Sequence, residues 1–247
     1  MNDDYNAVTV SDSLRKKLLP MVRPRVDGFS IFDFYSSDPQ YPIGRDFFDY
    51  VETPAGQLAI TAGDVFGFGN DRHVIMARVS GQLRSLLKLG TRPGTALQIV
   101  NRDLAETDLG MASAVIALLD PKTCVVELTN AGHCPALLSH VNGAVERPGE
   151  SESGIPVGIL IDGFSTKNVL LHLDRGDCLT LYTDGVVEAT GEAGEMYGSE
   201  RLMRRIEMLS REPRQIGAGI VDDLKQFVGQ SVSNDSACLV CIARDLL

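Results

Sequence analysis

Four aspartates stand beside glycine or at the ends of strand-like runs, where carboxylates could do chemistry. They are Asp46, Asp64, Asp184 and Asp235. Carboxylate oxygens are the ligands that hard divalent ions such as Mg²⁺ and Mn²⁺ prefer. Each aspartate taken alone is also an ordinary turn residue, and Asp184-Gly185 after the apolar run 179–182 is a good hairpin pattern. The first question is therefore whether the fold brings these acids together.

Asp64 lies in the most unusual stretch of the chain, residues 60–70, where three glycines stand at positions 63, 67 and 69. A β-prone run over 51–61 precedes this stretch, and an apolar pattern of helical spacing begins near His73. The stretch predicts a strand, a tight glycine loop and a helix. Glycines let the backbone come close to a ligand or an ion, and an acid at that point can supply charge.

Other catalytic chemistries lack their patterns in this sequence. The four histidines have no metal-ligand spacing: His73, His133, His140 and His172. The chain contains no Gly-x-Ser-x-Gly nucleophile pattern and no glycine-lysine phosphate loop. A set of carboxylates with backbone carbonyls therefore remains the main candidate, and it favours Mg²⁺ or Mn²⁺.

Composition narrows the class of protein. The 247 residues are 44% apolar and 23% charged, which is typical of a soluble globular protein. A net charge of −10 without a basic block argues against a nucleic-acid partner. Apolar runs of about nine residues are too short to span a membrane, which takes about 20. Five cysteines without a disulfide or zinc pattern, and no signal peptide, predict a cytoplasmic protein with reduced thiols.

The predicted elements come in runs of strands and runs of helices. Strands are predicted over 28–35, 45–50, from 57 into the glycine loop, 112–119, 125–130, 135–139, 170–173, 178–182 and 236–244, and helices over 14–20, 73–89, 93–104, 201–210 and 213–228. This order favours an α+β layered fold over a doubly wound parallel sheet. We expect a tail over residues 1–11 and a single domain over 12–247.

Several motifs occur in a fixed order over residues 14–243. They are Leu-Leu-Pro at 18–20, Ile-Gly-Arg-Asp-Phe-Phe-Asp at 43–49, Gly-Asp-Val-Phe-Gly-Phe-Gly at 63–69, Asn-Ala-Gly-His-Cys-Pro at 130–135, Gly-Ile-Pro-Val-Gly at 154–158, Leu-Tyr-Thr-Asp-Gly-Val-Val-Glu at 181–188 and Asn-Asp-Ser-Ala-Cys-Leu-Val at 234–240. In this order the motifs resemble the SpoIIE/RsbU branch of the PPM (PP2C-type) metal-dependent serine/threonine phosphatases.

The resemblance implies a central antiparallel β-sandwich flanked by helices, in four layers α/β/β/α, with two Mn²⁺ or Mg²⁺ ions at one end. By position in the motifs, Asp64 would bridge the ions and the Val65 carbonyl would be a backbone ligand. Asp46 would bind one ion and Asp184 the other. The closing motif, at Asn234 or Asp235, would complete the second site. A water shared by the ions would attack phosphorus directly, with no further catalytic residue.

The resemblance also implies a partner. Family members usually dephosphorylate a serine or threonine of an anti-sigma-factor antagonist, a small protein of the STAS type. The helix pair at 73–104 corresponds to the element thought to couple a regulatory input to the metal site, and it could also form a homodimer. Arg45 could contact the substrate phosphate, or pair with Asp46 or Asp49. His133 is expected to have a turn or packing role.

Four positions depart from the family pattern, and the first is Arg45, which replaces the family's second glycine beside Asp46. Phe68 stands where the family commonly has histidine, Phe66 where it has serine, and Asn234 where it has the closing aspartate. An amide oxygen carries no charge and binds a hard ion more weakly than a carboxylate does. Asn234 and Phe68 support an alternative, a catalytically weakened PP2C-like scaffold that binds a regulatory partner without efficient hydrolysis.

Overall fold

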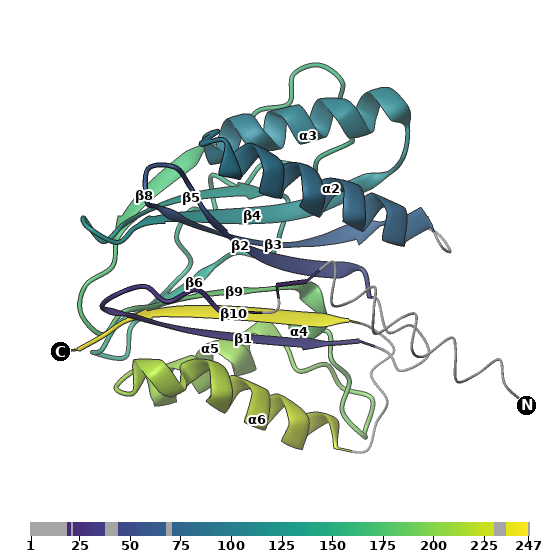
Figure 1. Cartoon of the computed structure of the whole chain (residues 1–247). Helices are drawn as coiled ribbons and strands as arrows, with labels where there is room; N and C mark the ends of the chain where they lie inside the picture. Colours follow the sequence, from purple (N-terminus) through teal and green to yellow (C-terminus); the bar gives the residue numbers. More distant parts are fainter. Residues whose placement is uncertain (1–18, 21, 38–43, 68–70, 230–235, 247) are drawn as a thin grey trace, which may run out of the picture.

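The computed structural model describes residues 19–20, 22–37, 44–67, 71–229 and 236–246. Its strands form two five-stranded antiparallel sheets that lie face to face, and helices cover the outer face of each sheet (Figure 1). The layers run helix, sheet, sheet, helix. The predicted α+β class, a central antiparallel β-sandwich flanked by helices, is confirmed.

The first sheet is largely a meander, because four of its strands pair in the order in which they occur in the chain. Its strands, in spatial order, are β2 (Asp46–Glu52), β3 (Leu58–Phe66), β4 (Met111–Asp120), β5 (Val125–Ala131) and β8 (Asn168–His172). The helices α2 (Asp71–Lys88) and α3 (Pro93–Thr107) cover its outer face (Figure 1).

The second sheet joins the two ends of the described chain. Its strands, in spatial order, are β1 (Phe29–Ser36), β10 (Ala237–Arg244), β9 (Cys178–Tyr182), β6 (Leu137–Ser139) and β7 (Val145–Glu146). Its outer helices are α5 (Ser199–Leu209) and α6 (Ile216–Val228), and the short 3₁₀ helix η1 (Pro213–Gln215) precedes α6. The last strand therefore lies inside this sheet rather than at its edge.

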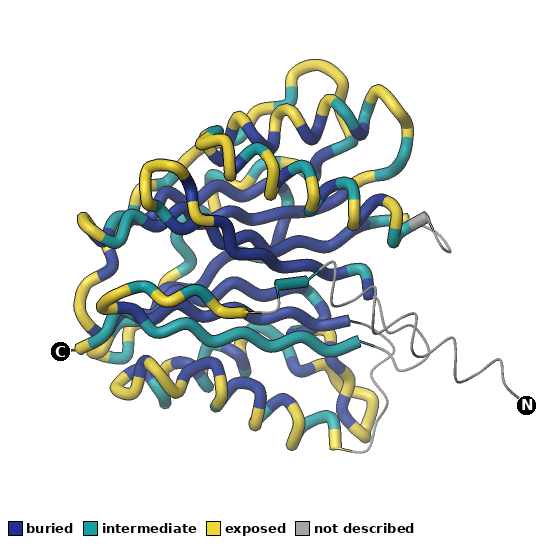
Figure 2. The backbone as a smooth tube through the Cα atoms, viewed as in Figure 1, coloured by how far each residue is buried: buried dark blue, intermediate teal, exposed yellow. Residues whose placement is uncertain are grey.

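The buried hydrophobic side chains form three clusters. Most strands of the two sheets are buried along their length (Figure 2). On β3, Leu58, Ile60 and Ala62 enter the cluster between the sheets, whereas Ala59 and Val65 enter the cluster beneath α2 and α3. A third cluster lies between the second sheet and α5 and α6. Because successive side chains of a strand point to opposite faces, Asp64 lies on the same inner face as Ala62.

The predicted elements agree with the observed ones apart from a few local differences. The hairpin interpretation of Asp184-Gly185 is wrong, because β9 leads into the short helix α4 (Asp184–Val187). Strand β7 was not predicted. Most of the helix predicted over 14–20 and the whole tail 1–11 lie outside the described residues, and Leu19 and Pro20 are not helical. Among the residues that the structure describes, no helix is long and apolar enough to cross a membrane.

Candidate metal centre

Asp46 and Asp64 face each other across the paired strands β2 and β3. The Val65 amide donates to the Arg45 carbonyl at 3.3 Å, so the two aspartates form a non-hydrogen-bonded pair, the arrangement that brings opposite side chains closest. Asp46 lies on the same face of β2 as Phe48, and Asp64 lies on the same face of β3 as Ala62. Both carboxylates therefore point into the space between the sheets. Both are almost fully buried, with exposed fractions of 0% and 1%.

The second sheet contributes Asp184. Leu179 and Leu181 of β9 pack in the core between the sheets, and two residues further on the side chain of Thr183 lies on the same face. Asp184 then begins α4. Carboxylate oxygens of Asp46, Asp64 and Asp184 all lie within 4.8 Å of one another. The structure thus brings together three of the predicted site residues, two from one sheet and one from the other.

Glycines allow the close approach of the segments that carry these acids. A Cβ at Gly63 would lie 2.4 Å from the Phe47 ring and 2.5 Å from the Ser113 carbonyl oxygen. A Cβ at Gly185 would lie 1.8 Å from the carbonyl oxygen of Ser236, which directly precedes β10. Since these neighbours are an aromatic ring and backbone atoms, no larger side chain fits without displacing the strands.

Two hydroxyl groups, those of Thr183 and Ser236, hold the side chain and the backbone of Asp46 in place. The Thr183 hydroxyl donates to Asp46 Oδ2 at 2.6 Å and accepts from the Cys238 amide at 2.9 Å. Ser236 Oγ accepts from the amides of Arg45 and Asp46, at 3.0 and 3.3 Å. Thr183 and Ser236 were not singled out in the sequence. Thr183 could have been found there, because alternation from Leu181 places its side chain on the inner face.

Arg45 lies at the edge of this centre, with its Nε 3.9 Å from Asp64 Oδ1. The alternative in which Arg45 pairs with Asp49 is wrong. Asp49 lies on the opposite face of β2, where Arg84 of α2 donates to both of its carboxylate oxygens. Burial raises the pKa of Asp49, and the bonds from Arg84 oppose that shift. Asp49 thus ties α2 to the strand that carries Asp46.

His133 is buried close to the centre and packs as a neutral side chain. Ser113 Oγ lies 2.7 Å from its Nδ1, and Ser113 is the residue opposite Asp64 on β4. Asn130 Oδ1 accepts from the His133 amide at 2.8 Å. Burial lowers the pKa of His133 to about 4, because the imidazolium form would lose its hydration. These contacts agree with the expected turn or packing role.

The carboxylate cluster suits a hard divalent cation by its chemistry. Three anionic side chains within 4.8 Å repel one another, and when ionised each pair costs about 3 kcal/mol at an effective dielectric constant of 20. A cation removes this cost, and oxygen-only donor sets are those that Mg²⁺ and Mn²⁺ prefer. Val65 directly follows Asp64 and is fully buried. Asn234 and Asp235 lie outside the described residues.

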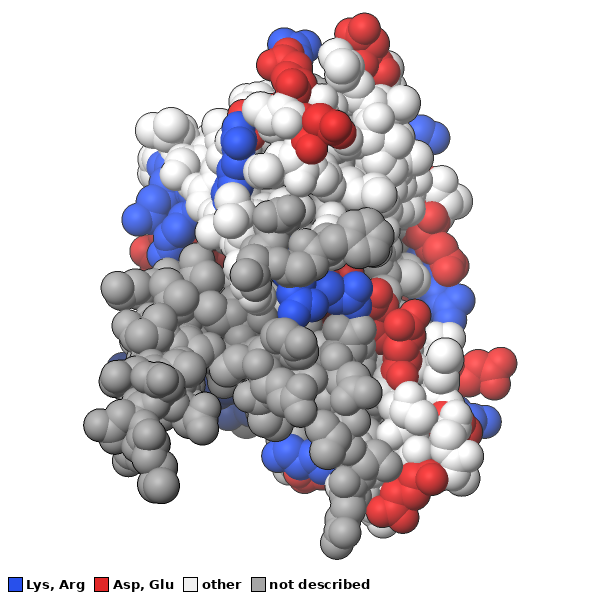
Figure 3. Space-filling model, turned by 90° about the vertical axis from the view of Figure 1, so that its right-hand side faces the viewer, with Lys and Arg blue, Asp and Glu red and all other residues white. Residues whose placement is uncertain are grey.

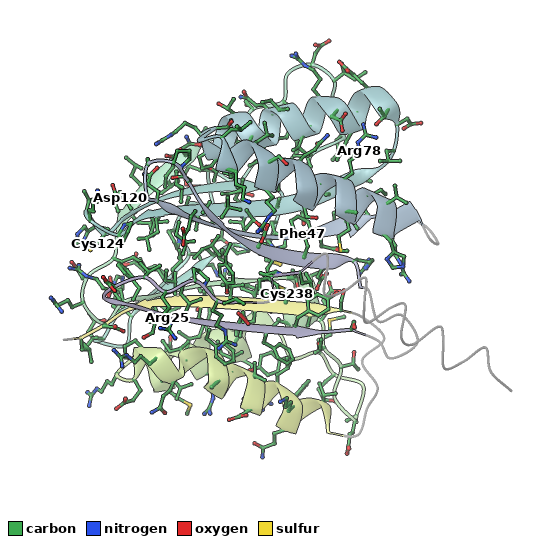
Figure 4. All side chains as sticks on the ribbon, viewed as in Figure 1. Arg25, Phe47, Arg78, Asp120, Cys124 and Cys238 are labelled. Atoms are coloured by element: carbon green, nitrogen blue, oxygen red, sulfur yellow. The ribbon has the colours of Figure 1, made fainter. Side chains whose placement is uncertain are left out.

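The centre lies at one end of the sandwich, the end that Figure 3 turns toward the viewer. Acidic and basic side chains are interspersed on this face, and uncharged atoms cover much of its upper half. The turn residue Asp120 and its neighbour Cys124 mark the opposite end (Figure 4). A chain with this sandwich and this set of acids has the architecture of a metal-dependent hydrolase of the PP2C class.

The family comparison agrees with this architecture. The family model for Stage II sporulation protein E (SpoIIE) matches residues 54–245, most of the chain. The chain therefore belongs to the SpoIIE family of PP2C-type serine/threonine phosphatases. Among curated proteins, IcfG from Synechocystis sp. is 24% identical over 265 residues. That match covers 94% of this chain and 40% of IcfG, so the chain corresponds to less than half of this relative.

Solved structures support the same fold. The SiaA-PP2C domain of Pseudomonas aeruginosa superposes with a TM-score of 0.80 at 19% identity, covering 98% of this chain and 97% of that one. The RsbU and RsbW domains of a Mycobacterium tuberculosis protein superpose with a TM-score of 0.76 at 24% identity, covering 90% of this chain and 62% of that one.

Proposed function

We propose that this chain is a metal-dependent protein phosphatase that hydrolyses phosphoserine or phosphothreonine on a partner protein. The observation that carries the proposal is the meeting of Asp46, Asp64 and Asp184 within 4.8 Å, drawn from both sheets of a PP2C-type sandwich. Two divalent ions, Mn²⁺ or Mg²⁺, would occupy the centre. A binuclear site is the usual protein solution for in-line displacement at phosphorus.

The chain's own residues would hold the ions and orient the substrate. Asp64 would bridge the two ions, Asp46 and Asp184 would bind one each, and the Val65 carbonyl would add a backbone ligand. The closing segment would complete the second site through Asn234 or Asp235. When bound, the ions supply positive charge to the phosphate oxygens and lower the pKa of the attacking water.

Thr183 and Arg45 would serve the site in different ways. The Thr183 hydroxyl directs its proton to Asp46, since its oxygen already accepts from the Cys238 amide, and so holds one Asp46 oxygen in place. Arg45 carries a planar guanidinium next to Asp64, a group suited to phosphate oxygens. We propose that Arg45 contacts the substrate phosphate.

For the partner, we propose a phosphorylated anti-sigma-factor antagonist of the STAS type. Membership of the SpoIIE family and similarity to an RsbU domain support this choice.

We propose a reducing, cytoplasmic compartment for the chain, and its five free cysteines, four of them buried, support this proposal. We also propose that residues 12–247 form one domain, and that homodimers, if they form, use α2 and α3.

Metal binding and phosphate release together test the proposal. Calorimetry with Mn²⁺ should give two ions per chain, and the Mn²⁺-loaded chain should release phosphate from p-nitrophenyl phosphate and from a phosphoserine protein. Asp64→Asn and Asp184→Asn should each reduce turnover by more than about 100-fold, since even outer partners of metal ligands contribute 10–100-fold. Glu52→Gln, at the exposed end of β2, is the matched control. A folded chain without turnover at any Mn²⁺ concentration would refute the proposal.

The substitution Asn234→Asp, which restores the aspartate of the family pattern, distinguishes the scaffold alternative from the phosphatase. It rests on Asn234 and Phe68, which both lie outside the described residues, and no observation within those residues favours it. If Asn234→Asp raised turnover many-fold from near zero, the native chain would be a binding module. A native chain that is already active, and that this substitution changes little, excludes the alternative.

A further inference from the structure

A groove of about 640 Å³ opens beside the metal centre. Arg45 lines one side of it, and the same arginine lies 3.9 Å from Asp64. Most of the other lining is apolar, including Phe66, Ile75, Leu109, Met111 and Ile159. Phe66 ends β3 two residues after Asp64, so the groove lies next to the strand end that carries this acid. Its volume is in the range of pockets that bind small ligands or a few side chains.

The wall of the groove that contains Ile159 is fixed by hydrogen bonds on both of its sides. Val157 and Ala112 exchange backbone hydrogen bonds of 2.8 and 3.0 Å. The buried side chain of Asn101, on α3, accepts from the Gly158 amide at 2.9 Å and donates to the Leu160 carbonyl at 2.7 Å. Ile159 lies between these fixed points. Its loop is therefore held in place before any ligand binds.

Close glycine contacts form the base of the groove. Gly158 has φ 91°, and a Cβ there would lie 2.4 Å from the Gly110 carbonyl oxygen. Gly110 has φ 141°, and a Cβ there would lie 2.6 Å from Ile75 Cδ1. Two residues that accept unusual backbone angles thus let the loop pack directly on the start of β4. A rigid site loses little entropy on binding, which favours a preformed recognition surface.

Apolar side chains remain exposed along this rigid wall. Ile159 is 47% exposed and Met111 is 41% exposed. Water contact with such groups is unfavourable, and a fixed loop cannot turn them inward. An apolar side chain that covered them would remove this cost, at about 25 cal/mol per Å². The groove therefore fits a ligand that is apolar where it meets Met111 and Ile159.

We propose that this groove binds an apolar side chain adjacent in sequence to the phosphorylated residue of the partner protein. The inference rests on the proposed phosphatase function and adds a specificity determinant to it. Arg45 and the metal centre attract the dianionic phosphate at one end, and the apolar wall takes the neighbouring side chain. Asp108 also lines the groove, so an acidic neighbour would be repelled. The substrate is thus a phosphoserine or phosphothreonine flanked by a leucine-like residue.

A peptide panel with the full chain and Mn²⁺ tests the substrate side. Each phosphoserine peptide would carry a single leucine at one position from three residues before to three after the phosphoserine, in a glycine-serine background. Leucine at one or two positions should raise kcat/KM at least five-fold, and aspartate at the same positions should lower it. Equal kcat/KM values within two-fold across the panel would overturn the groove proposal.

Two groove variants test the protein side. Ile159→Glu and Met111→Glu should each reduce, by ten-fold or more, the ratio of kcat/KM for the best leucine peptide to kcat/KM for p-nitrophenyl phosphate. Leu170→Glu on β8 and Met208→Glu on α5 are matched controls, since both side chains are exposed far from the groove. These controls should keep the native ratio. If the groove variants also keep it, the proposal fails.

The outcomes separate this inference from the function on which it rests. A native chain that hydrolyses p-nitrophenyl phosphate but treats all peptides alike refutes the groove and leaves the phosphatase intact. A native chain that hydrolyses neither substrate refutes the phosphatase and the groove together. Circular dichroism confirms that each variant is folded. If both groove variants misfold, the peptide panel on the native chain decides the question.

Discussion

The two ends of the β-sandwich contain similar residues and differ in what the opposite sheet brings to them. At one end of the β2–β3 pair, Asp46 faces Asp64, and Asp184 arrives from the second sheet. At the other end, Glu52 pairs with Leu58 and its side chain is exposed. An acid at a strand end thus remains a solvated turn residue unless another sheet closes over it. Convergence of both sheets, rather than residue type, makes the centre.

Glycines at the two ends also differ in whether another segment of the chain packs against them. Gly185 at the centre has backbone atoms of Ser236 where its Cβ would stand. Gly56, in the turn between β2 and β3, has no atom within 4 Å of that point, and its φ of 76° serves the turn alone. One end uses glycine for close packing and the other uses it for chain reversal.

The largest expected effect is on the free energy of unfolding, when alanine replaces each of these two glycines. Gly185→Ala should destabilise the fold by about 3 kcal/mol, because its Cβ would lie 1.8 Å from a backbone oxygen. Gly56→Ala should cost only about 1 kcal/mol, the usual penalty for a left-handed residue. Urea unfolding of the two variants measures both values. Equal costs would contradict the distinction between packing and turn glycines.

Acidification should destabilise the end that carries the carboxylate cluster through His133. Burial lowers its pKa to about 4 in the folded chain, from 6.5 when solvated. Between these values the unfolded chain binds a proton that the folded chain does not, so stability falls as pH falls from about 6.5 to about 4. The loss is about 3 kcal/mol for this one group.

Unfolding free energies measured from pH 7 to pH 4 isolate this contribution. His133→Gln should remove about 3 kcal/mol of the pH dependence, since the variant has no imidazole to protonate. His172→Gln, at the exposed end of β8, is the control, because its ring faces solvent in both states. The interpretation of His133 fails if both variants show the same pH dependence as the native chain.

The Thr183 hydroxyl bridges Asp46 and the Cys238 amide, and removing this bridge should have a smaller effect, on the affinity for Mn²⁺. Thr183→Val keeps the shape of the side chain but removes the donor to Asp46, so Mn²⁺ affinity should fall 10–100-fold. Thr183→Ser retains the hydroxyl and should stay close to the native affinity. Calorimetric titration with Mn²⁺ compares the three chains. Equal affinity of the valine and serine variants would show that the bridge does not position Asp46.

The smallest effect concerns the metal-free chain. Two ionised carboxylates 4.8 Å apart repel by about 3 kcal/mol at a dielectric constant of 20, and attraction to Arg45 offsets part of this repulsion. Without divalent ions, Asp64→Asn should therefore raise stability by about 1 kcal/mol. Glu52→Gln should change it by less than about 0.5 kcal/mol. Thermal unfolding in a chelator tests both, and destabilisation by Asp64→Asn would contradict the repulsion.

Alternation along the strands made part of the centre predictable from sequence. Asp46 shares the face of Phe48, and Asp64 that of Ala62, so both acids belong to the inner face of a sandwich. Their meeting with Asp184 could not follow from alternation, because it depends on how the two sheets stack. The order of the motifs supplied that information through the family resemblance.

The remaining differences come from contacts between distant segments. Asp184-Gly185 has a hairpin pattern, yet α4 forms there because the closing strand occupies the space next to Gly185. The groove depends on Asn101, a helix residue that bonds to a loop far along the chain. Local patterns do not encode such tertiary contacts. The structure brings Asp46, Asp64 and Asp184 together. The ligand roles of all the named residues, which are Asp46, Asp64, Val65, Asp184, Asn234 and Asp235, stay predictions, as does the phosphate contact of Arg45.

The position of β10 bears on when the carboxylate cluster can assemble during folding. This strand is the last of the described strands, yet it lies between β1 and β9, and Ser236 just before it holds the backbone at Asp46. Pairing of segments so far apart is slow and must await the synthesis of β10. A nascent or truncated chain would therefore lack an assembled centre. The Ser236 hydroxyl that holds the backbone at Asp46 is therefore put in place only once β10 has paired with β1 and β9.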